Sequence, residues 1–148
     1  MRKSELSTQQ LAQRATFLQR LGAAGWMGQA LNAAFERGLW VDYEATMDYT
    51  NARARLSLLY SAEDESLELL LDEDWRYIVV IAFGAHFEQV LDLIIAEQDR
   101  LSAETLTALL QRLLDLGLAE VYLYSEERGR MPVDESILAE LHQELVDG

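Results

Sequence analysis

Hydrophobic and polar positions alternate along the segment from Trp40 to Tyr49, which is the most regular pattern in the chain. From Val41 onward every second side chain is apolar, and the side chains between them are mostly acidic. Successive side chains of a β-strand point to opposite faces, so this alternation predicts a strand with one buried and one solvated face. The same period recurs over residues 53 to 61 and 66 to 73. Short polar loops separate the three segments, and we therefore expect an antiparallel meander.

The alternation also predicts how these strands align. Inward positions are odd-numbered in the first strand, even-numbered in the second and odd-numbered in the third, so paired residue numbers must sum to an odd number. With connecting loops of about four and six residues, Arg55 is expected opposite Asp48 on one side and Asp72 on the other. Exposed pairs of this kind stabilise a sheet by roughly 0.2–1 kcal/mol each and imply no catalysis.

Three later segments are predicted to form a strand, a helix and a further strand. Residues 75 to 83 are apolar on both faces apart from Arg76, which predicts a strand covered on both sides. Residues 86 to 100 return to helical spacing, and a strand continuing through Ile95 is the alternative interpretation. Residues 119 to 125 alternate again and predict a fifth strand.

The first helix is expected to begin near Thr8, because Ser7 and Gln10 have the spacing of a capping box. Glycines at positions 22, 25 and 28 predict a bend or break near residues 22 to 25, followed by a second helical half that runs through Trp26 and ends at Gly38. Their spacing loosely resembles a nucleotide loop, but no strand precedes them and no Lys-Ser or Lys-Thr pair follows. Close packing of a helix on the sheet is the better explanation.

Two further helices are predicted in the C-terminal third. One is expected between Ser102 as N-cap and Gly117, with Leu118 placed to complete a Schellman closure. After the charged turn at residues 126 to 130, Pro132 is expected to prevent a regular helix or strand from continuing through it. Asp134 is expected to cap the last helix.

The elements therefore follow the order α-β-β-β-β-α-α-β-α. We see no internal repeat or linker, and 148 residues is a common size for one domain. The sequence predicts a single α+β domain over residues 1–148, in which helices pack on a mainly antiparallel sheet of four or five strands.

Charge is the compositional feature that bears on partners. The chain has 12 basic and 26 acidic side chains, a net charge of −14, which opposes binding to nucleic acid and to anionic membranes. We therefore expect no nucleic-acid or membrane partner and, if there is a partner, a basic protein. The N-terminus has no signal-peptide core and the run Tyr77–Phe83 is too short to cross a bilayer, so a cytoplasmic location is expected. Acidity that serves only solubility is the alternative interpretation.

Candidate chemistry is sparse. There is no cysteine, and His86 and His142 are far apart in the sequence and outside any metal-binding spacing. The acidic runs at residues 63 to 65 and 72 to 74 have no EF-hand pattern and are better explained as solvated turns. The one lysine, Lys3, lies near the N-terminus. We expect no enzyme activity, no cofactor and no metal ion.

The remaining candidates for function are the outward acids of the predicted meander, an aromatic residue of the same parity and one acidic loop. An acidic face of this kind suits electrostatic capture of a basic protein. We expect an intracellular inhibitor or immunity-type protein that neutralises a basic toxin or enzyme. The alternative is a small acidic secretion-type chaperone or adaptor that acts as a homodimer, and a purely structural role is the third possibility. The predicted partner-binding residues are Trp40, Asp42, Glu44, Asp48, Glu63, Asp64, Glu65, Glu68 and Asp72.

Overall fold

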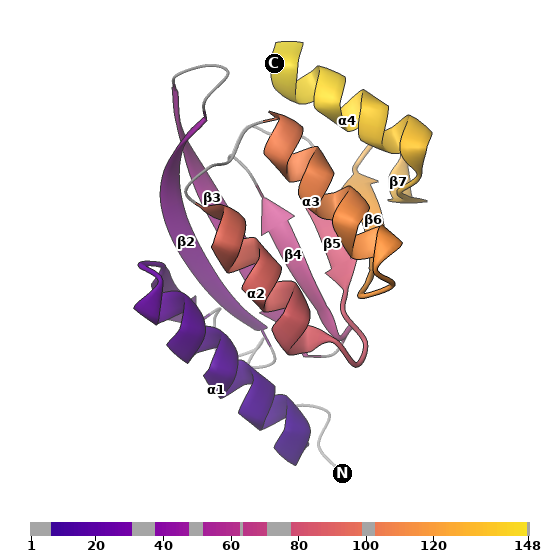
Figure 1. The fold of residues 1–148 in the computed structure, drawn as a ribbon. Helices are drawn as coiled ribbons and strands as arrows, with labels where there is room; N and C mark the ends of the chain where they lie inside the picture. Colours follow the sequence, from indigo (N-terminus) through magenta and orange to yellow (C-terminus); the bar gives the residue numbers. More distant parts are fainter. Residues whose placement is uncertain are drawn as a thin grey trace.

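A computed structural model describes residues 7–30, 38–47, 52–62, 64–70, 78–98 and 103–147. Within them the chain forms helices and one antiparallel sheet, whose strands are neighbours in their sequence order. This confirms the predicted α+β fold class, with helices packed on the sheet (Figure 1). The elements are α1 (Thr8–Ala23), β1 (Met27–Ala30), β2 (Gly38–Met47), β3 (Ala52–Ser61), β4 (Ser66–Leu70), β5 (Ile78–Ala82), α2 (Phe87–Glu97), α3 (Ala103–Asp115), β6 (Glu120–Ser125), β7 (Gly129–Pro132) and α4 (Glu135–Asp147).

The first helix begins and ends where the sequence predicts. The Ser7 hydroxyl accepts a hydrogen bond from the Gln10 N–H at 3.1 Å, and the Gln10 side chain accepts one from the Ser7 N–H at 2.8 Å. At the other end Gly25 has a φ of 101°, and the Trp26 N–H donates to the Leu21 carbonyl at 2.9 Å. A left-handed glycine followed by this bond closes a helix, so the predicted break is confirmed.

The prediction of a second helical half after this break is wrong for residues 27 to 30. They form β1, which pairs antiparallel with β2. Pairing with a neighbouring strand has overridden the local helical spacing, as tertiary contacts often do. At Gly28 a Cβ atom would lie 3.1 Å from Leu18 Cδ2, so glycine here lets α1 approach the sheet closely, as the sequence suggests. Residues 31 to 37 lie outside the described residues.

The odd-sum rule for strand register holds, but one of the two predicted alignments is wrong. Arg55 lies opposite Glu44 rather than Asp48, because strand pairing ends at Met47 opposite Ala52 and the connecting segment begins two residues earlier than expected. The alignment of β3 with β4 has the predicted register over its described pairs, from Ser57 opposite Leu70 onward. Asp48 and Asp72 themselves lie outside the described residues.

Residues 86 to 100 had two possible interpretations, a helix or a strand continuing through Ile95, and the structure shows a helix. The segment after β5 forms α2, so Ile95 is helical. The end of α3 is the predicted Schellman closure: Gly117 has a φ of 67°, and the Leu118 N–H donates to the Leu113 carbonyl at 3.0 Å.

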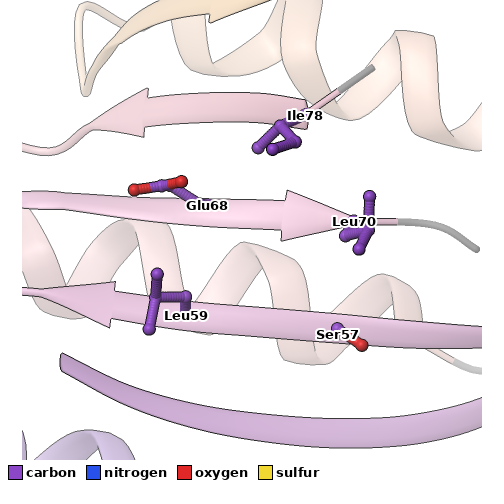
Figure 2. Close-up of a pocket in the computed structure, with 5 residues that line it drawn as sticks. All are labelled: Ser57, Leu59, Glu68, Leu70 and Ile78. Carbon is purple, nitrogen blue, oxygen red and sulfur yellow. The ribbon is translucent and has the colours of Figure 1, made fainter. Parts of the chain in front are cut away.

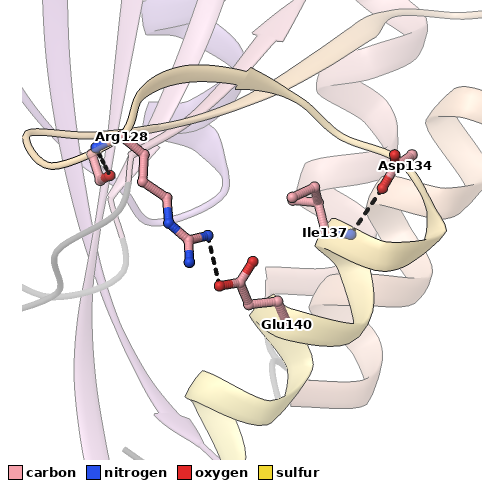
Figure 3. Close-up of polar contacts among 5 residues, drawn as sticks. Arg128, Asp134, Ile137 and Glu140 are labelled. Atoms are coloured by element: carbon pink, nitrogen blue, oxygen red, sulfur yellow. Dashed lines mark hydrogen bonds and ion pairs between the residues drawn. The ribbon is translucent and has the colours of Figure 1, made fainter.

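The C-terminal region contains one strand that the sequence analysis does not predict. Part of the expected charged turn forms β7, which pairs with β6 up to Pro132 opposite Tyr122. Proline is tolerated there because β7 lies at the edge of the sheet. Asp134 accepts a hydrogen bond from the Ile137 N–H at 2.9 Å and caps α4 as predicted (Figure 3). Arg128 then ties this turn to α4 through an ion pair with Glu140 at 2.7 Å (Figure 3).

The hydrophobic core lies between the helices and one face of the sheet (Figure 1). Each helix contributes buried residues to it, among them Phe17, Val90, Leu110 and Leu141. The strands contribute alternate positions, as expected for a sheet with one covered face. The buried strand residues of this face are Val41, Leu58, Tyr60, Leu67, Leu69, Val79, Ile81, Val121 and Leu123.

Tyr60 lies at the centre of an aromatic group in this core. Its ring contacts those of Phe17, Phe83 and Phe87, with centroid distances of 5.6, 6.3 and 5.8 Å. Its hydroxyl donates to Gln13 Oε1 of α1 at 3.0 Å. Burial, together with the nearby charge of Glu65, raises the pKa of Tyr60 to about 12. Tyr60 therefore joins β3 to α1 as a neutral, hydrogen-bonded phenol.

A candidate binding face on the open side of the sheet

The side of the sheet that faces away from this core is the candidate site. We call it the open face. Its side chains alternate along each strand with the buried residues of the core, so they point away from the helices. In the central strands the open face is more apolar than the sequence analysis assumes. It is defined by Ser57, Leu59, Glu68, Leu70, Ile78, Val80, Tyr122 and Tyr124.

Strand register aligns these residues in a transverse row. Leu59 lies opposite Glu68, Glu68 opposite Val80, and Val80 opposite Tyr122. On the other side of Leu59 the row continues to the backbone position of Trp40 in β2. Directly opposite residues on one face have Cβ atoms about 5 Å apart, so this row forms a continuous band across the sheet with Glu68 near its middle.

A depression in the open face surrounds Glu68. Ser57, Leu59, Glu68, Leu70 and Ile78 line it, and they come from three adjacent strands. Figure 2 shows these five side chains on the sheet, with the Glu68 carboxylate between the strands that carry Leu59 and Ile78. The lining is predominantly apolar, and among the described residues that form it Glu68 alone is ionisable. An apolar depression with a small number of placed polar groups is the usual form of a binding site.

The electrostatics of Glu68 distinguish it from the exposed acids nearby. Glu68 is half-buried. Burial raises the pKa of its carboxyl above the ordinary value, and the negative charge of Asp64 raises it further. The positive charge of Arg130 acts in the opposite direction but does not cancel these effects. The ionised form of Glu68 is therefore destabilised in the isolated protein, and a cation brought close to it would be attracted.

Ser66 lies two positions before Glu68 on β4, so the two side chains have the same parity. The Ser66 hydroxyl is buried and has no hydrogen-bond partner within the described part of the chain. A buried hydroxyl without a partner carries a desolvation cost. Strand β4 thus carries, two positions apart, a half-buried carboxylate whose ionised form is destabilised and a buried hydroxyl without a partner among the described residues.

The β6–β7 side of the open face carries an aromatic and cationic group. The Arg130 guanidinium lies over the Tyr122 ring, 4.3 Å from its centroid, which is within the range of a cation–π interaction. The Tyr122 hydroxyl donates to Glu120 Oε2 at 2.6 Å, and this bond raises the pKa of Tyr122. Arg130 thus lies over the ring of Tyr122, whose hydroxyl is bonded to Glu120.

The structure brings together some of the predicted partner-binding residues. Trp40 and Asp42 occupy β2 positions opposite Leu59 and Ser57, next to the depression. Glu44 pairs with Arg55, one row further along. Asp64 and Glu65 are exposed in the turn between β3 and β4, where Glu65 has a φ of 50°. Glu68 lies in the depression itself, whereas Asp48, Glu63 and Asp72 lie outside the described residues.

The apolar members of the site are what the sequence analysis missed. Leu59 and Leu70 occupy outward positions in strands whose other outward residues are polar. That departure from alternation was a usable signal, because outward apolar residues on neighbouring strands can form a contiguous patch, and such a patch marks a contact surface.

Other kinds of site find little support in the described residues. No group of three or more His, Cys, Asp or Glu side chains in those ranges is arranged to hold a metal ion. His86 precedes α2, and His142 lines a shallow groove between α3 and α4 with Thr107 and Gln111. Among the helices that the structure describes, none is long and apolar enough to span a bilayer.

Comparison with known proteins does not assign the chain to a family. No protein-family model, no curated protein and no solved structure matches it.

Proposed function

We propose that this protein is an acidic protein-binding module, an inhibitor or immunity-type protein that neutralises a basic toxin or enzyme. The observation that carries the proposal is the open face of the sheet, where an apolar depression surrounds the half-buried Glu68. A chain with a net charge of −14 attracts basic proteins over long range, which speeds association. The open face then supplies the apolar contact area on which affinity depends. A cytoplasmic location is part of this proposal.

The experiment is affinity capture of basic proteins by the tagged protein from its native lysate, with washes at low and then high salt. We expect one basic protein to be retained at low salt and released as salt screens the acidic surface. A triple variant that replaces Asp42, Glu44 and Glu68 with lysine should lose this protein.

The matched control reverses three exposed helical acids, Glu88, Asp115 and Glu135, and so changes the net charge by the same amount. This control should retain the partner, because its substitutions lie on the opposite side of the sheet. Equal loss in both variants would show that overall charge alone is responsible, and no loss in either would refute the proposed binding face.

The second candidate function is a secretion-type chaperone or adaptor that acts as a homodimer. It is favoured by the apolar side chains Leu59, Leu70 and Ile78 on the open face, because apolar contacts survive high salt. This candidate predicts a stable dimer in sedimentation equilibrium and several salt-resistant clients. A monomer with one salt-sensitive partner would exclude it.

A further inference from the structure

We propose that the depression around Glu68 is an anchor site for a single arginine side chain of the basic partner protein. This inference deepens the proposed function and rests on it. It assigns the occupant of the open face: a partner segment that places one guanidinium group against the Glu68 carboxylate, with its aliphatic stem between Leu59 and Ile78.

Charge complementarity favours a cationic occupant of the depression. Glu68 is half-buried among apolar side chains, and the nearby Asp64 is also negative. Arg130, the cation whose charge acts on Glu68, lies over the ring of Tyr122, and the hydroxyl of Tyr122 donates to Glu120. The site therefore carries a negative charge that the described residues do not neutralise, and a partner cation would compensate it where water is already partly excluded.

The shape and polarity of the depression favour arginine over lysine. Its walls are formed by Leu59, Leu70 and Ile78, and its polar atoms are those of Glu68 and Ser57. An arginine guanidinium is planar and weakly hydrated, so it can lie against apolar side chains while its N–H groups donate to both oxygens of a carboxylate. A lysine ammonium is compact and strongly hydrated, and would lose more hydration in the same place.

A second copy of this chain is a poorer occupant. Two copies would each bring a net charge of −14 to the interface, and like charges of this size favour the monomer. Each copy would also place its own Glu68 in the contact, where two half-buried carboxylates would destabilise one another.

The test uses small probes, so it does not depend on finding the partner. The full chain, labelled at leucine and isoleucine methyl groups, is titrated in NMR with Nα-acetyl-L-arginine methylamide. The matched neutral probe is the citrulline derivative, which keeps the shape and removes the charge, and the lysine derivative keeps the charge and changes the shape.

We expect saturable shifts at the methyl groups of Leu59, Leu70 and Ile78 with the arginine probe. Glu68→Gln should weaken this binding by roughly tenfold or more, as loss of a charge-assisted hydrogen bond implies. Glu88→Gln, on the exposed surface of α2, is the control and should bind as the wild type does. Unchanged spectra elsewhere in each variant establish that it is folded.

Several outcomes would overturn the inference. They are equal binding of the citrulline or lysine probe, shifts located away from the depression, unchanged binding by Glu68→Gln, or a dimer that buries Leu59 and Leu70. The proposed function fails separately, since a basic protein captured in a salt-sensitive manner but unaffected by Glu68→Gln would refute only the arginine anchor. Binding of the arginine probe without any captured basic protein would support the anchor chemistry and refute the inhibitor.

Discussion

Leu58 and Leu59 are consecutive residues of β3, yet they lie on opposite faces of the sheet and in different environments. Leu58 is fully buried beneath the helices. Leu59 is only partly buried and lines the depression beside Glu68. The covered face satisfies its polar groups internally, as the Tyr60 hydrogen bond to Gln13 shows. The open face keeps a destabilised carboxylate among apolar side chains. One face is thus organised for stability, whereas the other retains features that contribute little to stability and suit binding.

The largest expected effect comes from truncating these two leucines in turn. Leu58→Ala should lower the free energy of unfolding by about 2–5 kcal/mol, because it leaves a cavity in a packed core. Leu59→Ala should lower it by about 1 kcal/mol or less, because its side chain is already partly solvated. Urea unfolding monitored by tryptophan fluorescence measures both.

The same pair separates stability from binding. Leu59→Ala should weaken partner capture although the protein remains folded. Similar unfolding free energies for the two variants would show that the faces are not as different as the structure implies.

A smaller effect is expected at Tyr60 on the covered face, and it depends on pH. The pKa of Tyr60 is raised to about 12 from 10.0, so the native state holds this proton more tightly than the unfolded chain does. The stabilisation is complete below pH 10 and is lost as the pH rises through 10 towards 12. Tyr60→Phe should reduce the free energy of unfolding at pH 7 by roughly 0.5–1.5 kcal/mol through loss of the hydrogen bond.

The comparison that isolates the titration is the difference between wild type and Tyr60→Phe as a function of pH. We expect the advantage of the wild type to shrink between pH 10 and 12 in guanidinium unfolding. A constant difference across that range would mean that the phenol is not held neutral by the core.

The smallest expected effect is at Glu68 on the open face, where the substitution is expected to stabilise the protein and not to destabilise it. Its raised pKa means that the protonated form is favoured in the native state, so its contribution is present below the unfolded pKa and is lost as the pH rises through the native value. Glu68→Gln should therefore match the wild type at low pH and be more stable by less than about 1 kcal/mol at pH 7. Thermal unfolding at pH 4 and pH 7 measures the change. Loss of stability at pH 7 would indicate that the carboxylate supports the isolated fold.

The fold was predictable in most of its elements because their signals are local. The capping box of Ser7 and Gln10, the glycine closures at Gly25 and Gly117, and the alternation of β2 depend on nearby residues only. The errors have a different origin. Strands β1 and β7 lie at the two edges of the sheet, where each is defined by hydrogen bonds to one neighbouring strand. Such pairing overrides a weak local preference, and no short-range pattern reports it.

Of the candidate site, the sequence predicted only which acidic side chains point outward. Parity along the strands places Asp42 and Glu68 on the same outward face, and register confirms that their strands flank β3. What parity does not show is how far a residue is buried. Glu68 and Asp64 differ in burial: Asp64 is exposed, whereas Glu68 is half-buried and lines the depression with Leu59 and Leu70. Only the structure shows this difference.

The sequence by itself determined the types of most elements, with β1 and β7 as exceptions, the inward and outward faces of the predicted strands, and the acidic composition of the chain. Periodicity and charge are properties of the chain, so they carry over into any fold that preserves them. The tertiary structure decided the transverse row that joins Leu59, Glu68, Val80 and Tyr122, and the depression at its centre. These depend on register between strands. In the β2–β3 hairpin the loop begins two residues earlier than expected, so Arg55 lies opposite a residue four positions from the expected one, which leaves every parity intact while changing every neighbour.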